Sequence, residues 1–161
     1  MTLEVAIAFE LNDRPSSASV PADRSALAML REQFGLTGAK LACGEGECGA
    51  CTILVDGRSV NACLMAAVDC DGRVIETIEG LRTEEGLHPM QQAFVDQGAI
   101  QCGYCMPGMI MQAKYLADRQ PDLSLEALRR GLEGNICRCT GYQKVFDAVA
   151  AAAGLPKENQ P

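Results

Sequence analysis

The first part of the chain alternates between hydrophobic and polar positions, which is the pattern of half-buried strands. Over residues 3–10 every second position is a large apolar residue, with glutamate or alanine between them. Asn12-Asp13 predicts a turn, and residues 16–20 then return as a second strand. A closing strand is expected over residues 73–78. Together these segments predict a small mixed sheet.

Turn and cap residues mark the other elements of this first part. Apolar residues at helical spacing predict a helix over residues 27–34, with Gly35 as its C-terminal cap. The Asp-Gly pair at 56–57 is a strong signal for a two-residue hairpin turn between strands at 51–55 and 58–64. We therefore expect the sheet to lie over one helix.

The second half of the chain changes to a helical period. Hydrophobic residues recur every three or four positions, and prolines, a serine and the capping-box pair Thr140 and Gln143 stand where helices would begin. The sequence predicts a sheet domain over residues 1–79, a linker over 80–86 and a four-helix domain over 87–161. The expected helices cover residues 87–98, 107–120, 124–132 and 140–149.

Three cysteines before the hairpin follow the C-x4-C-x2-C spacing of a plant-type ferredoxin cluster loop. Three glycines between them allow positive φ angles, so the loop can bend tightly around a bulky group. A two-residue turn pairs Val55 with Arg58, which places Cys63 just beyond the position opposite Cys51. The hairpin would thus deliver a fourth thiolate. The expected ligands of this 2Fe–2S site are Cys43, Cys48, Cys51 and Cys63.

Two other interpretations of this loop are open. Its glycines spell GxGxxG, but a dinucleotide-binding motif follows a strand and opens a helix, whereas this segment opens a strand. A four-cysteine zinc site is the stronger alternative, because tetrahedral thiolate sites serve zinc as well as iron–sulfur clusters. Structural zinc usually pairs its cysteines as knuckles, which a C-x4-C interval is not.

The helical half carries a second set of four cysteines, in two pairs. Each pair lies just before an expected helix, so antiparallel packing would bring both pairs to one end, near helix N-termini. A thioredoxin-like redox pair would need a βαβ setting and would leave the other pair unused. Cys70 is left over, and we expect a small buried thiol there. The expected ligands of the second 2Fe–2S site are Cys102, Cys105, Cys137 and Cys139.

Composition narrows the class of protein. The net charge of −7 argues against a nucleic-acid partner or an anionic membrane surface. No leader and no long apolar run is found, so we expect no membrane insertion and a cytoplasmic location. The nine cysteines are an odd number, which argues against a complete disulfide framework. His88 is the only histidine, which excludes a Rieske centre, and we expect it at the surface.

With both cysteine sets placed, the sequence resembles the small iron–sulfur subunit of the molybdenum hydroxylases, the xanthine dehydrogenase family. The resemblance covers nearly the whole chain and implies an α+β fold. An N-terminal β-grasp, plant-type ferredoxin-like domain would precede a four-helix bundle that holds the second cluster. The stretches that carry the resemblance are residues 38–57, Cys63, QCGYCMPGMIM at 101–111 and GNICRCTGY at 134–142.

The resemblance also implies a function. The chain would be an electron-transfer subunit that relays electrons from molybdopterin cytosine dinucleotide in a large subunit, through both clusters, to FAD or another acceptor. Residues 106–109 resemble members that have a separate FAD-binding medium subunit, so a hetero-oligomer is expected. By the same resemblance Cys139 lies nearest the pterin and Gln101 hydrogen-bonds it; the simpler roles are a plain ligand and an exposed amide.

Other roles and functions stay open beside this one. Tyr104 and Arg138 are expected only to pack within their loops. The alternative functions are a free-standing two-cluster ferredoxin and a zinc-stabilised interaction module.

Overall fold

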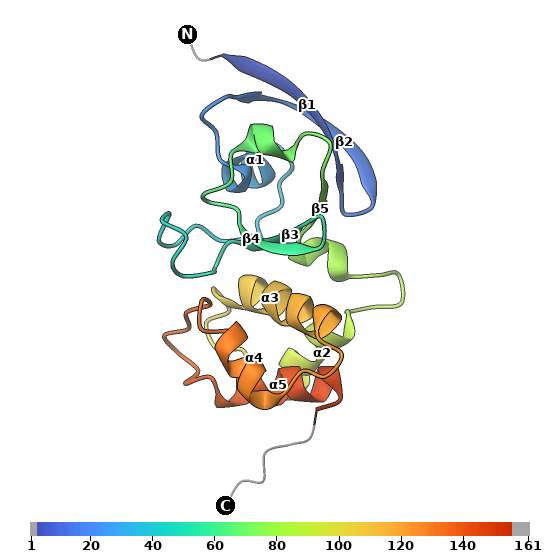
Figure 1. Ribbon diagram of the computed structural model, residues 1–161, viewed down its shortest axis with the longest axis vertical. Helices are drawn as coiled ribbons and strands as arrows, with labels where there is room; N and C mark the ends of the chain where they lie inside the picture. Colours follow the sequence, from blue (N-terminus) through green and yellow to red (C-terminus); the bar gives the residue numbers. More distant parts are fainter. Residues whose placement is uncertain (1–2, 156–161) are drawn as a thin grey trace, which may run out of the picture.

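The computed structural model describes residues 3–155 and shows two stacked parts (Figure 1). A five-stranded sheet with one helix forms the first part, and four helices form the second. The chain passes once from one part to the other. This arrangement confirms the predicted α+β class, with a ferredoxin-like sheet domain ahead of a helical domain.

Five strands form a single mixed sheet. They are β1 (Glu4–Leu11), β2 (Arg14–Pro21), β3 (Thr52–Val55), β4 (Arg58–Asn61) and β5 (Val74–Glu76). Their order across the sheet is β2-β1-β5-β3-β4. Strands β1 and β5 are parallel, whereas the other neighbours are antiparallel. The last strand in the sequence is therefore the central one.

Both predicted hairpins form, and their turn residues explain why. Asn12 and Asp13 have φ values of 50° and 62°, and Asp56 and Gly57 have values of 49° and 69°. Positive φ at both central residues defines a type I′ turn, and the twist of this turn matches that of the flanking strands. Leu3, which the alternation places on the inner face, is exposed, so burial starts further along β1.

Strand β3 is buried on both faces because a helix covers each side of the sheet (Figure 1). Ile53 and Val55 lie in the core that includes α1 (Ala26–Glu32). Leu54, between them, lies in the core of the helical part, against α3 (Met106–Arg119). The first cysteine loop leads directly into this shared strand, so it is held close to the helices.

The four predicted helices are present in the second part. Ser124 caps one of them as expected, since its hydroxyl accepts a hydrogen bond from the backbone N–H of Ala127. Methionines, small aliphatic side chains and Phe94 fill the core. Besides α3, the helices are α2 (Pro89–Asp96), α4 (Leu125–Gly131) and α5 (Gln143–Ala153). Within residues 3–155 no helix is both long and apolar enough to cross a membrane.

His88 is not the surface residue that the sequence predicted. It is half-buried, and its Nδ1 accepts a 3.1 Å hydrogen bond from the backbone N–H of Met90 at the start of α2. Gln91 completes a capping box by accepting from the backbone N–H of His88. Burial, helped by the charge of Lys114, lowers the pKa of His88, which favours the neutral imidazole that can accept this bond.

The connection between the two parts is short. Its first residues form the 3₁₀ helix η2 (Ile78–Leu81), whose Leu81 is buried in the helical core. An exposed turn follows, closed by hydrogen bonds between the backbones of Thr83 and Gly86. A second 3₁₀ helix, η1 (Ala67–Cys70), precedes β5. The predicted domain limits stay a prediction.

Candidate metal centres

The first cysteine loop, residues 43–51, has no helix or strand and projects from the sheet (Figure 1). Its three glycines adopt positive φ values between 66° and 77°, as the sequence predicted. The loop therefore curls, and the backbone N–H of Glu45 donates to Cys43 Sγ at 3.4 Å. Such curled backbones suit thiolates that surround a bulky group.

The β3–β4 hairpin brings Cys63 back to this loop. Val55 pairs with Arg58, and the backbone N–H of Ala62 donates to the carbonyl of Cys51 at 3.3 Å. Cys63 follows immediately, and its thiol interacts with that of Cys51. The register expected from the Asp-Gly turn is therefore the one in the structure.

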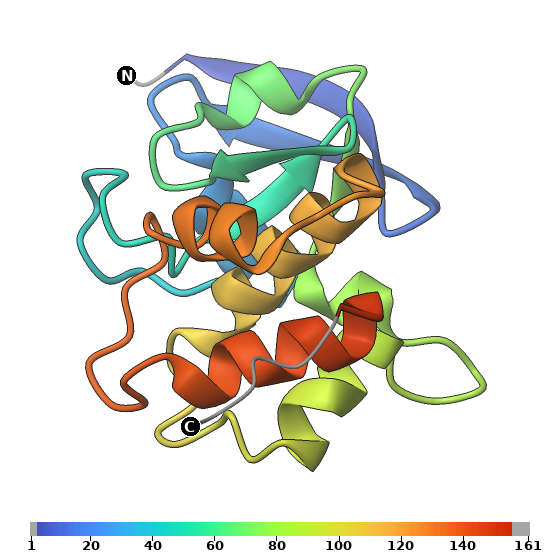
Figure 2. The ribbon, with the colours of Figure 1, turned by 60° about the horizontal axis from the view of Figure 1, so that its bottom comes forward.

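The second cysteine set lies on two loops of the helical part. One loop precedes α3, and the other joins α4 to α5. The Sγ atoms of Cys102 and Cys139 are 3.6 Å apart, although 37 residues separate them in the chain. The thiols of Cys105 and Cys137 also interact. These loops lie on the same side of the molecule as the first cysteine loop (Figure 2).

In each set, hydrogen-bonding contacts between thiols join two pairs of sulfurs, and members of the two pairs also interact electrostatically. A structural zinc ion takes four ligands around one atom, whereas a 2Fe–2S cluster takes two cysteines on each of two irons. Two sulfur pairs per site fit a binuclear cluster. The pairs are Cys43–Cys48, Cys51–Cys63, Cys102–Cys139 and Cys105–Cys137.

The sulfurs differ in how readily they ionise. The hydrogen bond from the Glu45 backbone lowers the pKa of the Cys43 thiol to about 6. Burial raises the pKa of the thiols of Cys51 and Cys105 to about 12 each. Metal ligation requires the deprotonated thiolate. The buried thiols of Cys51 and Cys105 would therefore lose their protons only as a metal binds.

Thr140 is not the helix cap that the sequence predicted. Its N–H and its hydroxyl both donate to Cys137 Sγ, at 3.4 and 3.1 Å. Burial raises the pKa of Cys137, but these bonds, together with hydrogen bonds from the Cys139 backbone and the Cys105 thiol, outweigh it and leave the pKa lowered. Helix α5 begins only at Gln143, because Gly141 and Tyr142 adopt left-handed φ values of 65° and 68°. That turn directs Thr140 to the sulfur.

The two residues expected to face the pterin both lie at the surface. Gln101 and Cys139 are exposed, and so is Cys102 beside them. Cys70 lies elsewhere, in the core of the sheet part, where burial raises the pKa of its thiol to about 11. Cys70, the ninth cysteine, is therefore a buried thiol, as expected.

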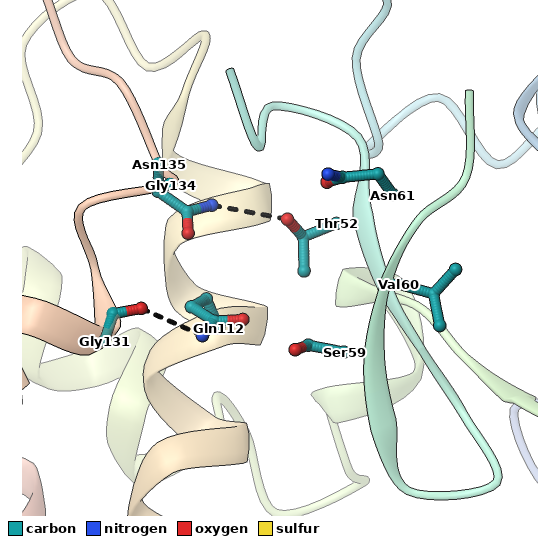
Figure 3. Close-up of a pocket in the computed structure, with 8 residues that line it drawn as sticks. All are labelled: Thr52, Ser59, Val60, Asn61, Gln112, Gly131, Gly134 and Asn135. Carbon is teal, nitrogen blue, oxygen red and sulfur yellow. Dashed lines mark hydrogen bonds between the residues drawn. The ribbon is translucent and has the colours of Figure 1, made fainter. Parts of the chain in front are cut away.

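Two asparagines that the sequence did not single out support the cysteine loops. Asn61 Nδ2 donates to the carbonyl of Gly46 at 2.6 Å, and Asn135 Nδ2 donates to that of Gly49 at 3.0 Å. Both line a cavity of about 130 Å³ between the hairpin and the helical part (Figure 3). The only sequence signal was the position of Asn135 within the GNICRCTGY stretch.

Two family models match the chain, one in each half. The model described as a 2Fe-2S iron-sulfur cluster binding domain matches residues 9–77. The model described as a [2Fe-2S] binding domain matches residues 77–150. Each match contains one cysteine set, so two 2Fe–2S-binding domains are present.

Curated relatives align along most of the chain. The nicotinate dehydrogenase small FeS subunit of Eubacterium barkeri is 44% identical over 149 residues, which cover 92% of this chain and 95% of that protein. The xanthine dehydrogenase iron-sulfur-binding subunit of Escherichia coli O157:H7 is 47% identical over 123 residues, covering 75% and 77%. The chain belongs to the iron–sulfur small subunits of the molybdenum hydroxylases.

A solved structure of an enzyme in this family has the same fold. Quinoline 2-oxidoreductase from Pseudomonas putida 86 matches with a TM-score of 0.90 and 39% identity, over 94% of both chains. Aldehyde oxidoreductase from Desulfovibrio gigas matches with a TM-score of 0.89 and 42% identity, over 93% of this chain and 17% of that one. As a family member, the chain is the iron–sulfur subunit of a multi-subunit oxidoreductase.

Proposed function

We propose that this subunit binds two 2Fe–2S clusters and transfers electrons within a molybdenum hydroxylase. The observation that carries the proposal is the pairwise approach of eight sulfurs on two sets of loops. Each set offers two thiols for each of two irons. The proposed ligands are Cys43, Cys48, Cys51 and Cys63 for one cluster, and Cys102, Cys105, Cys137 and Cys139 for the other.

The chain itself supplies the ligands and the hydrogen bonds around them. The backbone of Glu45 donates to one sulfur of the first site, and Thr140 donates twice to one sulfur of the second. Hydrogen bonds to cysteine sulfur stabilise its negative charge and so raise the reduction potential of a cluster. When bound, the two clusters supply one-electron carriers that lead from the molybdopterin of a large subunit to FAD or another acceptor.

The exposed position of Cys139 and Gln101 supports a contact with a partner at the second site. We assign Gln101 as a hydrogen-bonding partner of molybdopterin cytosine dinucleotide on the large subunit, with Cys139 as the nearest ligand. We assign the first site, where Cys43 is exposed, to the side that faces the acceptor, an FAD-binding medium subunit. A hetero-oligomer in the cytoplasm is the setting of this proposal.

The test is low-temperature EPR of the dithionite-reduced subunit, with iron and acid-labile sulfide counted on the same sample. Two distinct signals and about four irons are expected, because each 2Fe–2S centre contributes two. Cys48→Ser should remove one signal, whereas Cys70→Ser should leave both. Zinc in place of iron would support the zinc-stabilised module, and loss of iron in Cys70→Ser would contradict the ligand assignment.

Purification under native conditions distinguishes the proposed function from the remaining alternative, a free-standing two-cluster ferredoxin. A subunit of a molybdenum hydroxylase should elute as a larger complex that contains molybdenum and, with a medium subunit present, FAD. A free-standing ferredoxin would elute as a monomer with iron alone.

A further inference from the structure

The two cysteine loops are hydrogen-bonded directly to each other across the boundary between the sheet and the helices. The backbone N–H of Ile136 donates to the carbonyl of Cys48 at 2.9 Å. One residue earlier, Asn135 Nδ2 donates to the carbonyl of Gly49 at 3.0 Å. The chain next to Cys137 is therefore joined to the chain at Cys48 by two consecutive bonds.

The side chain of Asn135 is buried in this boundary, with 4% of its surface exposed. Its Nδ2 also lies 3.3 Å from Thr52 Oγ1, and that buried hydroxyl donates to the carbonyl of Gly49 at 2.7 Å. Figure 3 shows the amide directed at Thr52 across the boundary. A buried amide that loses its acceptors costs free energy, so this side chain resists any separation of the two loops.

On the helical side, Asn135 is fixed by its own backbone. Its N–H donates to the carbonyl of Leu132 at 2.9 Å, and its carbonyl accepts from the Tyr142 hydroxyl at 3.2 Å. The same hydroxyl accepts the N–H of Cys137 at 2.7 Å. The position of Asn135 is thereby coupled to that of a proposed cluster ligand.

Glycines allow the backbones of the sheet part and the helical part to approach each other closely. A Cβ atom on Gly49 would collide with Asn135 Nδ2 and with the carbonyl of Gly134. A Cβ atom on Gly108, in α3, would collide with the carbonyl of Gly49. The backbones approach as closely as the absence of side chains allows, so a change at this boundary must shift one cysteine loop against the other.

We infer that Asn135 is a positioning residue that fixes the separation of the two clusters. It ties Gly49 and Thr52 of the first site to the segment that carries Cys137 of the second. The inference rests on the proposed function, because the separation has a functional meaning only if both sites hold clusters.

The chain offers a matched control among the residues that line the same cavity. Gln112 Nε2 donates to the carbonyl of Gly131 at 2.9 Å, and both residues belong to the helical part (Figure 3). Gln112→Ala therefore removes an amide of similar chemistry that does not cross the boundary. Thr52→Val is a second test variant, since it removes one of the two acceptors of Asn135 Nδ2 while keeping the side-chain shape.

The experiment measures two quantities on the full-length, cluster-loaded protein. The first is hydrogen exchange, by mass spectrometry, of peptides covering residues 46–51 and 134–138. The second is the spin–spin interaction between the two reduced clusters, by EPR. In Asn135→Ala and Thr52→Val we expect about tenfold faster exchange in both peptides and an altered spin–spin interaction at unchanged iron content, with Gln112→Ala like the wild type.

Three results would overturn the inference. They are an unaltered spin–spin interaction in Thr52→Val and Asn135→Ala, unaltered exchange in both variants, or the same changes in Gln112→Ala. If Asn135→Ala loses iron, the inference is tested by the exchange rates and the spin–spin interaction of Thr52→Val alone. A wild-type protein without iron would instead refute the proposed function, a result that is distinct because it does not involve the variants.

Discussion

The hydroxyl of Tyr104 donates a 2.6 Å hydrogen bond to the backbone carbonyl of Leu41, 63 residues earlier in the chain. Tyr104 lies between two cysteines of the second site, and Leu41 precedes Cys43 of the first. The sequence assigned Tyr104 only to packing within its loop, whereas the structure makes it a link between the two sites.

Removing this hydroxyl should destabilise the protein slightly. Tyr104 is about half exposed, so the loss in Tyr104→Phe should be about 0.5–1 kcal/mol, which lowers the melting temperature by about 1–4 °C. Thermal unfolding followed by circular dichroism measures it. Tyr115→Phe is the control, because the Tyr115 hydroxyl has no hydrogen bond within residues 3–155. Equal shifts in both variants would contradict the assignment.

His88 should make stability depend on pH. Its pKa in the folded protein lies below the usual value of about 6.5, so the unfolded chain binds the proton more readily. The contribution of His88 to the free energy of unfolding is then fully present above the unfolded pKa of about 6.5. It is lost as the pH falls from that value toward the folded pKa. His88→Asn keeps a capping side chain without this titration. Between about pH 7.5 and 5.5 the wild type should therefore lose more stability than the variant. Parallel pH profiles of the two proteins would contradict this role of His88.

Thr140 should raise the reduction potential of the second cluster. Thr140→Val removes the hydroxyl that donates to Cys137 Sγ and keeps the N–H donor. Because the oxidised cluster carries less negative charge, losing a donor should lower the potential by tens of millivolts, on the order of one lost hydrogen bond. A redox titration followed by EPR measures both clusters. Thr140→Ser should retain the potential, and a shift confined to the first cluster would be inconsistent with this role.

Gly49 should tolerate alanine far less well than Gly72. Both have left-handed φ values, 66° and 68°, which cost alanine about 1–2 kcal/mol. Gly72 has open space around it, whereas a Cβ on Gly49 would meet Asn135 and Gly134. The overpacking should bring the loss in Gly49→Ala to about 2–5 kcal/mol in denaturant unfolding. Similar losses of stability in Gly49→Ala and Gly72→Ala would show that the boundary between the sheet and the helices can adjust to the added methyl group.

The β3–β4 hairpin and its register were predictable because their sequence signals are local. The Asp-Gly turn fixes the register of β3 and β4, and the register fixes where Cys63 falls. The predicted burial of Cys70 also follows from its type alone. Each of these predictions depends on a few neighbouring residues, so contacts with distant parts of the chain do not alter it.

The wrong predictions, and the contact of Asn135 that was not predicted, concern residues whose partners are set by backbone shape or by distant contacts. Thr140 and Gln143 have capping-box spacing, but two left-handed residues between them delay the helix. His88 caps α2 although histidine is not a usual cap residue. Asn135 bonds to Gly49, 86 residues away, so nothing near it in the chain signals its contact.

Within residues 3–155 the exposed turn at residues 82–86 is the only backbone passage from the sheet to the helices, yet other bonds also join the two parts. Lys114 of α3 forms an ion pair with Glu76 of β5, and Arg119 donates to the carbonyl of Gly57. Together with the shared burial of β3, these contacts make covalent continuity at the turn redundant for cohesion. A protease that cut the turn would produce two fragments that migrate as one particle until a denaturant separates them.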